Sequence, residues 1–368
     1  IKQYRYGEIM KLKNLLTLCI LPLCLISCGK KSIYKYEVRE VYIDSVPSKG
    51  IYGTELSIDL IGTNSLFVAD SLLVADIQNG SKPYFFEIYN LNTESLVTGI
   101  GMRGRAKYEF LSTPVIMTKQ YYNDEGDIII PVNEAGMIKE LNLSQSLSKN
   151  SNVVNNVFTG YDDRSASTVV IGKDHNMLFA YRYAKIDDYT PATGVLPTVC
   201  TIKDGEITSS WDCFNRFMKD HRINKDQAEY YYWGKLLKKP DSDIVVLPMF
   251  LMNYILFFNL ETDDFYAIHI DGSPTFQDGI NGETAGRCFF SATATSEYIY
   301  AYYCGDFDIV YEDNPDYAGR ILKFDWEGNL VEAYPIHDAV ITDIAYSETN
   351  KKLYGLNVYS GDLYSFDF

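Results

Sequence analysis

The densest group of possible metal ligands is an acidic run between residues 305 and 316. Its carboxylates belong to Asp306, Asp308, Glu312, Asp313 and Asp316. Hard cations such as Ca²⁺ prefer several oxygen donors, so the run is a candidate calcium site or a contact for a cationic ligand. Its spacing does not match a known calcium-binding loop, and we favour a solvated acidic loop as its interpretation.

Two aromatic stretches are candidates for ligand contact. Arg182, Tyr183 and Tyr189 lie where a predicted strand leaves the core, and they could form a stacking and hydrogen-bonding surface for a sugar or peptide. Tyr231 and Trp233 follow an insertion at residues 211–221, and an exposed cluster there would mark a site for carbohydrate or protein. In both stretches, packing between strands is the simpler explanation.

The familiar catalytic motifs are missing from the sequence. The four histidines are scattered and show no paired-ligand spacing, which weakens a metal-hydrolase interpretation. No Gly-x-Ser-x-Gly elbow, phosphate loop or dinucleotide fingerprint occurs. We therefore assign no catalytic residue, and we favour a protein that is not an enzyme.

The beginning of the chain has the pattern of a secretory signal. Met10, the expected biological start, is followed by Lys11 and Lys13 and by an apolar run over residues 15–26. The run ends at Ser27-Cys28, in a segment that resembles the bacterial lipobox. This resemblance implies cleavage after residue 27, acylation of Cys28 and a tether over residues 28–35. We expect the body of the protein outside the cytoplasm, on either face of the envelope.

Four cysteines follow the signal, in a compartment where disulfides are allowed. Cys288 and Cys304 are nearly equidistant from a predicted hairpin turn at residues 293–296, so they could face each other across adjacent strands. The sequence therefore predicts a possible disulfide between them. Cys200 and Cys213 flank another hairpin with arms of unequal length.

The fold is indicated by a repeat of short strands that end in Asn or Asp. These corner residues recur at intervals of 42 to 66 residues. They are Asn90, Asn142, Asp204, Asn259, Asp325 and Asp367. Short polar side chains bond the local backbone and tolerate the left-handed region that tight hairpins need. Such a repeat, with a near-continuous apolar strand before each corner, predicts an all-β, six-bladed propeller of four-stranded blades.

The ends of the chain bear on how this ring closes. The sixth corner lies one residue before the end of the sequence, so the last blade lacks a fourth strand. Residues 36–44 form an alternating strand without an obvious partner, and we expect this strand to complete the last blade. The propeller domain then covers residues 36–368. A pair of β-sandwiches, the main alternative, does not explain why the count ends within a blade.

Charge excludes some partners. The net charge of the 368 residues is −16, and it becomes more negative when the basic signal segment is removed. Such a surface repels the phosphates of nucleic acids and anionic lipid headgroups, so neither is expected as a direct partner. The membrane contact that we expect is the lipid anchor.

One loop carries a family resemblance. The segment Gly101-Met-Arg-Gly-Arg-Ala-Lys-Tyr-Glu-Phe110 resembles the Gly-x-x-Gly-Arg-Gly-Pro-x-Glu-Phe signature of the TolB-like six-bladed propeller lipoproteins of Bacteroides-type bacteria. Ala106 and Lys107 stand where the family has Gly and Pro, which implies a less tightly turned loop. The resemblance implies an outer-membrane lipoprotein and carries over no catalytic residue. From the residues themselves we expect Arg103 or Arg105 to pair with Glu109.

Together these observations predict an envelope-anchored propeller that binds a protein, peptide or glycan without catalysis. The alternative is a hydrolase or lyase that acts on a glycan through carboxylates and tyrosines in the central channel. Two carboxyl groups within about 5 to 10 Å at the channel mouth would support the enzyme. An apolar mouth would favour binding.

Overall fold

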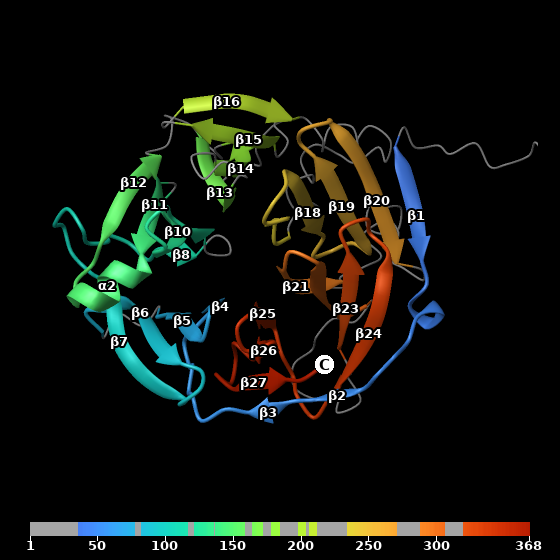
Figure 1. The fold of residues 1–368 in the computed structure, drawn as a ribbon, viewed down its shortest axis with the longest axis horizontal. Helices are drawn as coiled ribbons and strands as arrows, with labels where there is room; N and C mark the ends of the chain where they lie inside the picture. Colours follow the sequence, from blue (N-terminus) through green and yellow to red (C-terminus); the bar gives the residue numbers. More distant parts are fainter. Residues whose placement is uncertain are drawn as a thin grey trace, which may run out of the picture. The chain divides into compact units, whose positions relative to one another are not determined.

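A computed structural model describes residues 36–77, 82–116, 121–135, 137–158, 164–171, 178–184, 198–203, 206–211, 234–270, 288–305 and 319–368. These residues belong to one compact unit, Tyr36–Phe368. Among them, β-strands form six sheets, and the inner strands of most successive sheets contact one another around a ring (Figure 1).

The first three sheets follow one another along the chain between residues 66 and 211. The first contains β4 (Leu66–Ala69), β5 (Leu72–Asp76), β6 (Tyr84–Asn90) and β7 (Ser95–Met102). The second contains β8 (Val115–Ile116), β9 (Tyr121–Tyr122), β10 (Ile128–Glu134), β11 (Met137–Asn142) and β12 (Val154–Phe158), with α2 (Leu143–Lys149) before β12. The third contains β13 (Arg164–Ile171), β14 (Leu178–Ala184), β15 (Thr198–Lys203) and β16 (Glu206–Trp211).

The other three sheets each include a strand from the beginning of the described chain. The fourth contains β17 (Leu237–Lys238), β18 (Ile244–Pro248), β19 (Tyr254–Asn259), β20 (Asp264–Ile270) and β1 (Glu37–Val41). The fifth contains β21 (Phe289–Ala294), β22 (Tyr298–Tyr303), β23 (Arg320–Asp325), β24 (Leu330–His337) and β2 (Ile51–Tyr52). The sixth contains β25 (Asp343–Ser347), β26 (Lys352–Leu356), β27 (Leu363–Phe366) and β3 (Thr54–Glu55). A short 3-10 helix, η1 (Ile43–Ser45), lies between β1 and β2.

The predicted corners are confirmed where the structure describes a turn. The side-chain Oδ1 of Asn90 accepts hydrogen bonds from the N–H groups of Asn92 and Thr93. Asn259 and Asp325 accept equivalent bonds from the residues that follow them. Asn142 departs from the pattern, because its side chain caps the N-terminus of α2 instead of turning directly into a strand.

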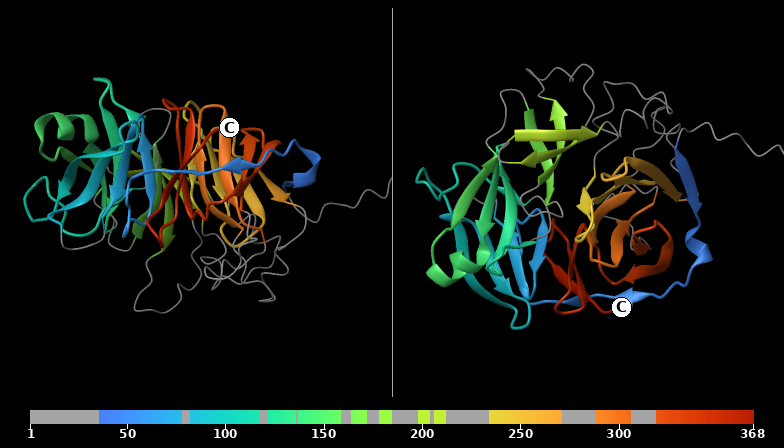
Figure 2. Two further views of the ribbon diagram at one scale, coloured as in Figure 1. Left: turned by 90° about the horizontal axis from the view of Figure 1, so that it is seen from below. Right: turned by 45° about the horizontal axis from the view of Figure 1, so that its top comes forward.

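The prediction for the closing strand was wrong in its choice of strand. Residues 37–41 form β1, which pairs in parallel with β20 of the fourth sheet and not with the last sheet. The last sheet gains its fourth strand from β3, which pairs antiparallel with β27. Figure 2 shows this N-terminal segment, in blue, passing along the outer edges of three successive sheets. Alternation marked β1 as a strand, but it could not distinguish one exposed sheet edge from another.

The core lies between adjacent sheets. Apolar side chains of the fourth and fifth sheets, including Val246, Phe257 and Leu322, form one buried cluster. A second cluster joins the fifth and sixth sheets, and a third joins the sixth and first. In three of the sheets, the strand next to the inner strand is buried on both faces, as its apolar sequence predicted. These second strands are β18, β22 and β26.

Candidate functional site

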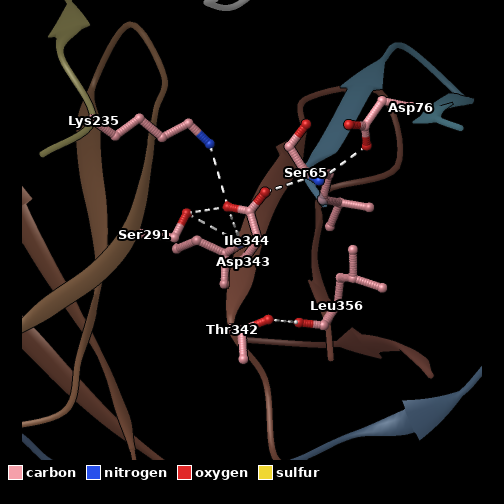
Figure 3. A network of polar contacts seen from close by, with 9 residues as sticks. Ser65, Asp76, Lys235, Ser291, Thr342, Asp343, Ile344 and Leu356 are labelled. Atoms are coloured by element: carbon pink, nitrogen blue, oxygen red, sulfur yellow. Dashed lines mark hydrogen bonds and ion pairs between the residues drawn. The ribbon is translucent and has the colours of Figure 1, made fainter. Parts of the chain in front are cut away.

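Polar groups gather where several inner strands begin. Asp343 is the first residue of β25, Ser65 and Leu66 lie at the start of β4, Ser291 lies on β21, and Lys235 precedes β17. Figure 3 shows the Lys235 and Ser291 side chains pointing toward the Asp343 carboxylate, and Ser65 bonded to Asp76. The group therefore connects four sheets that are far apart in the sequence.

The Asp343 carboxylate accepts several hydrogen bonds at once. Its Oδ2 accepts a bond of 2.6 Å from the backbone N–H of Leu66. Its Oδ1 accepts from the Ser291 hydroxyl and from the N–H of Ile344, and lies 3.4 Å from Nζ of Lys235. Hydrogen bonds to a carboxylate are stronger than hydrogen bonds between neutral groups, so Asp343 holds the neighbouring sheets together at this point.

A second carboxylate, Asp76, lies in the wall behind Asp343. Its Oδ1 accepts bonds of 3.0 Å from the N–H groups of both Asn64 and Ser65. Burial raises the pKa of the Asp76 carboxyl, and the negative charge of Asp343 acts in the same direction, whereas the two N–H donors oppose the shift. Asp76 is thus a buried acid whose ionised form is disfavoured.

The two carboxylates are close together because neighbouring backbone nitrogens bind them. The nitrogens of Ser65 and Leu66 are separated by no more than about 3.8 Å. With the two hydrogen-bond lengths of 3.0 and 2.6 Å, the bonded oxygens of Asp76 and Asp343 lie within roughly 10 Å of each other. An acid with a raised pKa near a second carboxylate is an arrangement that can support proton transfer.

A small, mainly apolar cavity lies among the inner strands. Its volume is about 90 Å³, and it is lined by residues of β4, β8, β21 and β25 and by β17 with the residues just before it, including Phe67, Ile116, Leu236 and Ala292. Lys235, Ser65 and Tyr346 are among the polar side chains in this lining. Pockets for drug-sized ligands measure about 300 to 1,000 Å³, so this space fits water or a small molecule.

The binding residues predicted from the sequence fall largely outside the described part of the chain. Tyr189, Tyr231, Trp233 and the lipidation site Cys28 lie outside it. The same holds for the acidic run Asp306, Asp308, Glu312, Asp313 and Asp316. Arg182 and Tyr183 lie on β14, paired with Thr198 of β15 and Ser165 of β13 respectively. These candidates stay predictions.

The predicted disulfide is not formed in the structure. Cys288 and Cys304 are both buried, and the N–H of Cys304 donates a 2.8 Å bond to the carbonyl oxygen of Cys288. Their side chains, however, belong to different clusters: Cys288 packs between the fourth and fifth sheets, and Cys304 between the fifth and sixth.

The glycine-containing loop at residues 101–110 has a structural role in the described residues. The Arg103 guanidinium lies 3.7 Å from the centroid of Phe85 and donates to the carbonyl oxygens of Tyr84 and Ile77. Glu109 accepts from the N–H of Ala106 and does not form the expected pair with Arg103 or Arg105. Gly104 leaves the space for this carboxylate, because a Cβ there would lie 1.9 Å from it.

Sequence reasoning missed Asp76, Lys235 and Asp343. Asp76 ends the apolar strand 72–76 and Asp343 begins the strand 343–347, so a charged residue at the end of a buried strand was the available signal. That signal is weak, because such residues also occur at ordinary solvent-exposed strand ends. The network arises only when distant strand ends meet.

Comparison with known proteins identifies the architecture. The structure of a member of the DUF4221 family from Bacteroides vulgatus is similar with a TM-score of 0.53 at 10% sequence identity, covering 87% of this chain and 96% of that one. The fold is a β-propeller. A luciferin-regenerating enzyme is similar with a TM-score of 0.48 at 11% identity, covering 86% of this chain and 94% of that one.

No family model and no curated protein matches the sequence. The structural similarity therefore assigns the propeller fold to the chain and nothing about its activity.

Two further findings concern the described residues. No helix among them has the length and apolar character needed to cross a membrane. In the same part of the chain, no group of three or more His, Cys, Asp or Glu side chains is arranged to hold a metal ion.

Proposed function

We propose that the chain is an envelope-anchored lipoprotein of the TolB-like propeller type, acylated at Cys28, whose six blades present a non-catalytic binding or scaffold surface for a protein, peptide or glycan. Five of the sheets are described with their side chains, and the third sheet, β13–β16, is described by its strand pairing, which supports the count of six blades. The lipobox-like segment supports the anchor, and the acidic net charge argues against nucleic acid as a partner.

The observation that carries the proposal is that the polar groups beside the small cavity are already bonded to one another. The Asp343 carboxylate is occupied by Leu66, Ser291, Ile344 and Lys235, and the adjoining space is narrow and mainly apolar. The polar groups there serve to join blades. Recognition is therefore assigned to the loops at the end of the channel, where propellers present their variable residues.

A thermal-shift screen of the soluble chain from Gly29 onward tests this proposal. The ligands are glycans, peptides and divalent cations, because selective binding raises the stability of the native state. We expect a glycan or peptide to raise Tm, and substitution of Arg182, Tyr183 or Tyr189 to remove that shift. A shift with Ca²⁺ alone would move the site to the acidic run. Turnover of a glycan during the screen would contradict a non-catalytic role.

One observation favours the alternative, an enzyme that acts on a glycan. The bonded oxygens of Asp76 and Asp343 are no more than roughly 10 Å apart, a limit that includes the carboxylate separations of about 5 to 9.5 Å in glycosidases. In that case Asp76 is the proton donor and Asp343 the ionised partner. Asp76→Asn would then abolish release of reducing sugar from a substrate glycan while the propeller stays folded.

A further inference from the structure

The strand β1 is an addition to a sheet that is already complete. The fourth sheet has four strands, β17 to β20, without it. Ring closure does not depend on β1 either, because β3 completes the last sheet by pairing with β27. β1 covers the outer edge of β20 over five residues, from Glu37 opposite Tyr266 to Val41 opposite Ile270.

Side-chain contacts of β1 are specific but lie near the surface. None of its five residues is buried, whereas β19 in the same sheet is buried along nearly its whole length. The guanidinium of Arg39 lies 4.4 Å from the centroid of Tyr266 and donates a 2.7 Å bond to the carbonyl oxygen of Glu327. Glu40 Oε2 lies 2.7 Å from Nδ1 of His269, whose ring packs against Tyr254.

We propose that the outer edge of β20 is a docking site for an extended peptide, which β1 occupies in cis and which a strand of a partner polypeptide can occupy in its place. The inference goes beyond the proposed function, because it places a peptide ligand at the outer edge of one sheet and not at the loops. Main-chain hydrogen bonds supply affinity at such an edge, and alternate side chains supply specificity.

The chemistry of the edge specifies the partner strand. A cation opposite Ile268 can lie over Tyr266 and reach the Glu327 carbonyl, and an acid at the next position can bond His269. The partner segment is therefore extended, parallel to β20, and carries an Arg-Glu pair. Displacement of β1 leaves a four-stranded sheet and a closed ring, so its cost is confined to the contacts of one strand.

The resident strand competes strongly because it is tethered. A short linker gives a cis segment an effective concentration of the order of millimolar, so a free peptide binds the wild-type protein poorly. Weakening the contacts of β1 within the full chain makes the outer edge of β20 accessible to a free peptide. The double variant R39E/E40K removes the contacts of Arg39 with Tyr266 and Glu327 and of Glu40 with His269. It keeps the packing of Val41 against the core and leaves β2, β3 and every residue of β20 unchanged.

The test measures fluorescence anisotropy of a labelled peptide with the sequence of residues 36–45. We expect saturable binding to the R39E/E40K chain, at least about tenfold tighter than binding to wild type. The same peptide with the Arg and Glu exchanged for Glu and Lys should bind neither chain. Equal affinity for both chains, or no saturable binding to R39E/E40K, would overturn the proposal.

A thermal melt of R39E/E40K completes the test. We expect its Tm to lie within about 5 °C of wild type, because exposed contacts contribute little to stability. A loss of the folded state would show that β1 is an integral strand and would also overturn the proposal. Binding at the loop face is measured separately with the ligand screen, so either idea can fail without the other.

Discussion

Asp343, in the last sheet, accepts a 2.6 Å hydrogen bond from the backbone N–H of Leu66, in the first. The ring is thus closed on its inner side by a side chain, and on its outer side by the pairing of β3 with β27. A third contact joins the same two sheets, from the Ser347 hydroxyl to the carbonyl oxygen of Asp70. These contacts lead to specific expectations for stability.

Asp343→Asn should lower the free energy of unfolding by about 2 to 4 kcal/mol, because it removes the charge that Lys235 and the surrounding donors stabilise. Urea denaturation at neutral pH measures the change. The matched control is Asp367→Asn, since the Asp367 side chain is 76% exposed and pairs with Lys352 at 3.4 Å. The control should change stability by less than about 0.5 kcal/mol. Equal effects of both variants would contradict the role given to Asp343.

Asp76→Asn should stabilise the protein increasingly as the pH rises. The folded-state pKa of Asp76 is raised by burial, so the folded form holds its proton more tightly than the unfolded chain does. Wild-type stability from this group is therefore present below the unfolded value of about 3.9 and is lost as the pH rises through the folded pKa.

Asparagine keeps the acceptor for the N–H groups of Asn64 and Ser65 but carries no charge. Denaturation of both proteins from pH 4 to pH 8 gives the difference in stability at each pH. A difference that stays constant, or that shrinks with rising pH, would show that burial does not disfavour the Asp76 carboxylate.

Substitutions of the buried ion pair Glu134 and Lys139 should have strongly non-additive effects on the free energy of unfolding. Glu134 is fully buried, accepts from the N–H groups of Leu111 and Ser112, and forms an ion pair with Lys139. Glu134→Gln leaves the lysine charge without its partner and should cost about 3 to 5 kcal/mol. The double variant E134Q/K139M should recover much of this loss, and additive effects in the cycle would argue against the pair.

Gly101 should tolerate alanine less well than Gly126 does. Both have positive φ, 75° and 80°, so each substitution costs about 1 to 2 kcal/mol in backbone strain. A Cβ on Gly101 would also lie 2.7 Å from Cδ2 of Phe86, whereas none would be met at Gly126 within 4 Å. We expect G101A to be less stable than G126A by about 1 to 3 kcal/mol, measured by urea denaturation. Equal losses would mean that Phe86 moves aside.

Cys288 and Cys304 should both react as thiols after denaturation without reductant. Their positions in separate clusters keep the sulfur atoms apart in the native fold. Alkylation with iodoacetamide followed by peptide mass spectrometry counts the modified residues. Recovery of a linked peptide pair would show that the oxidised protein adopts a different backbone at this edge.

The sequence alone determined the features that depend on local chemistry. Asn90, Asn259 and Asp325 bond the backbone within a few residues of themselves, so their role in the corners could be predicted from type and spacing. The second strands could also be predicted from the sequence, because burial on both faces requires a continuous run of apolar residues in one short segment.

Tertiary structure decided what depends on closing the ring. Exposed outer edges offer β1 the same kinds of main-chain donors and acceptors, and side-chain contacts with groups such as Tyr266, His269 and the carbonyl of Glu327 select β20. The group of Asp76, Lys235 and Asp343 likewise has no local signature. Its members are up to 267 residues apart in the sequence and become neighbours only because the first and last sheets meet.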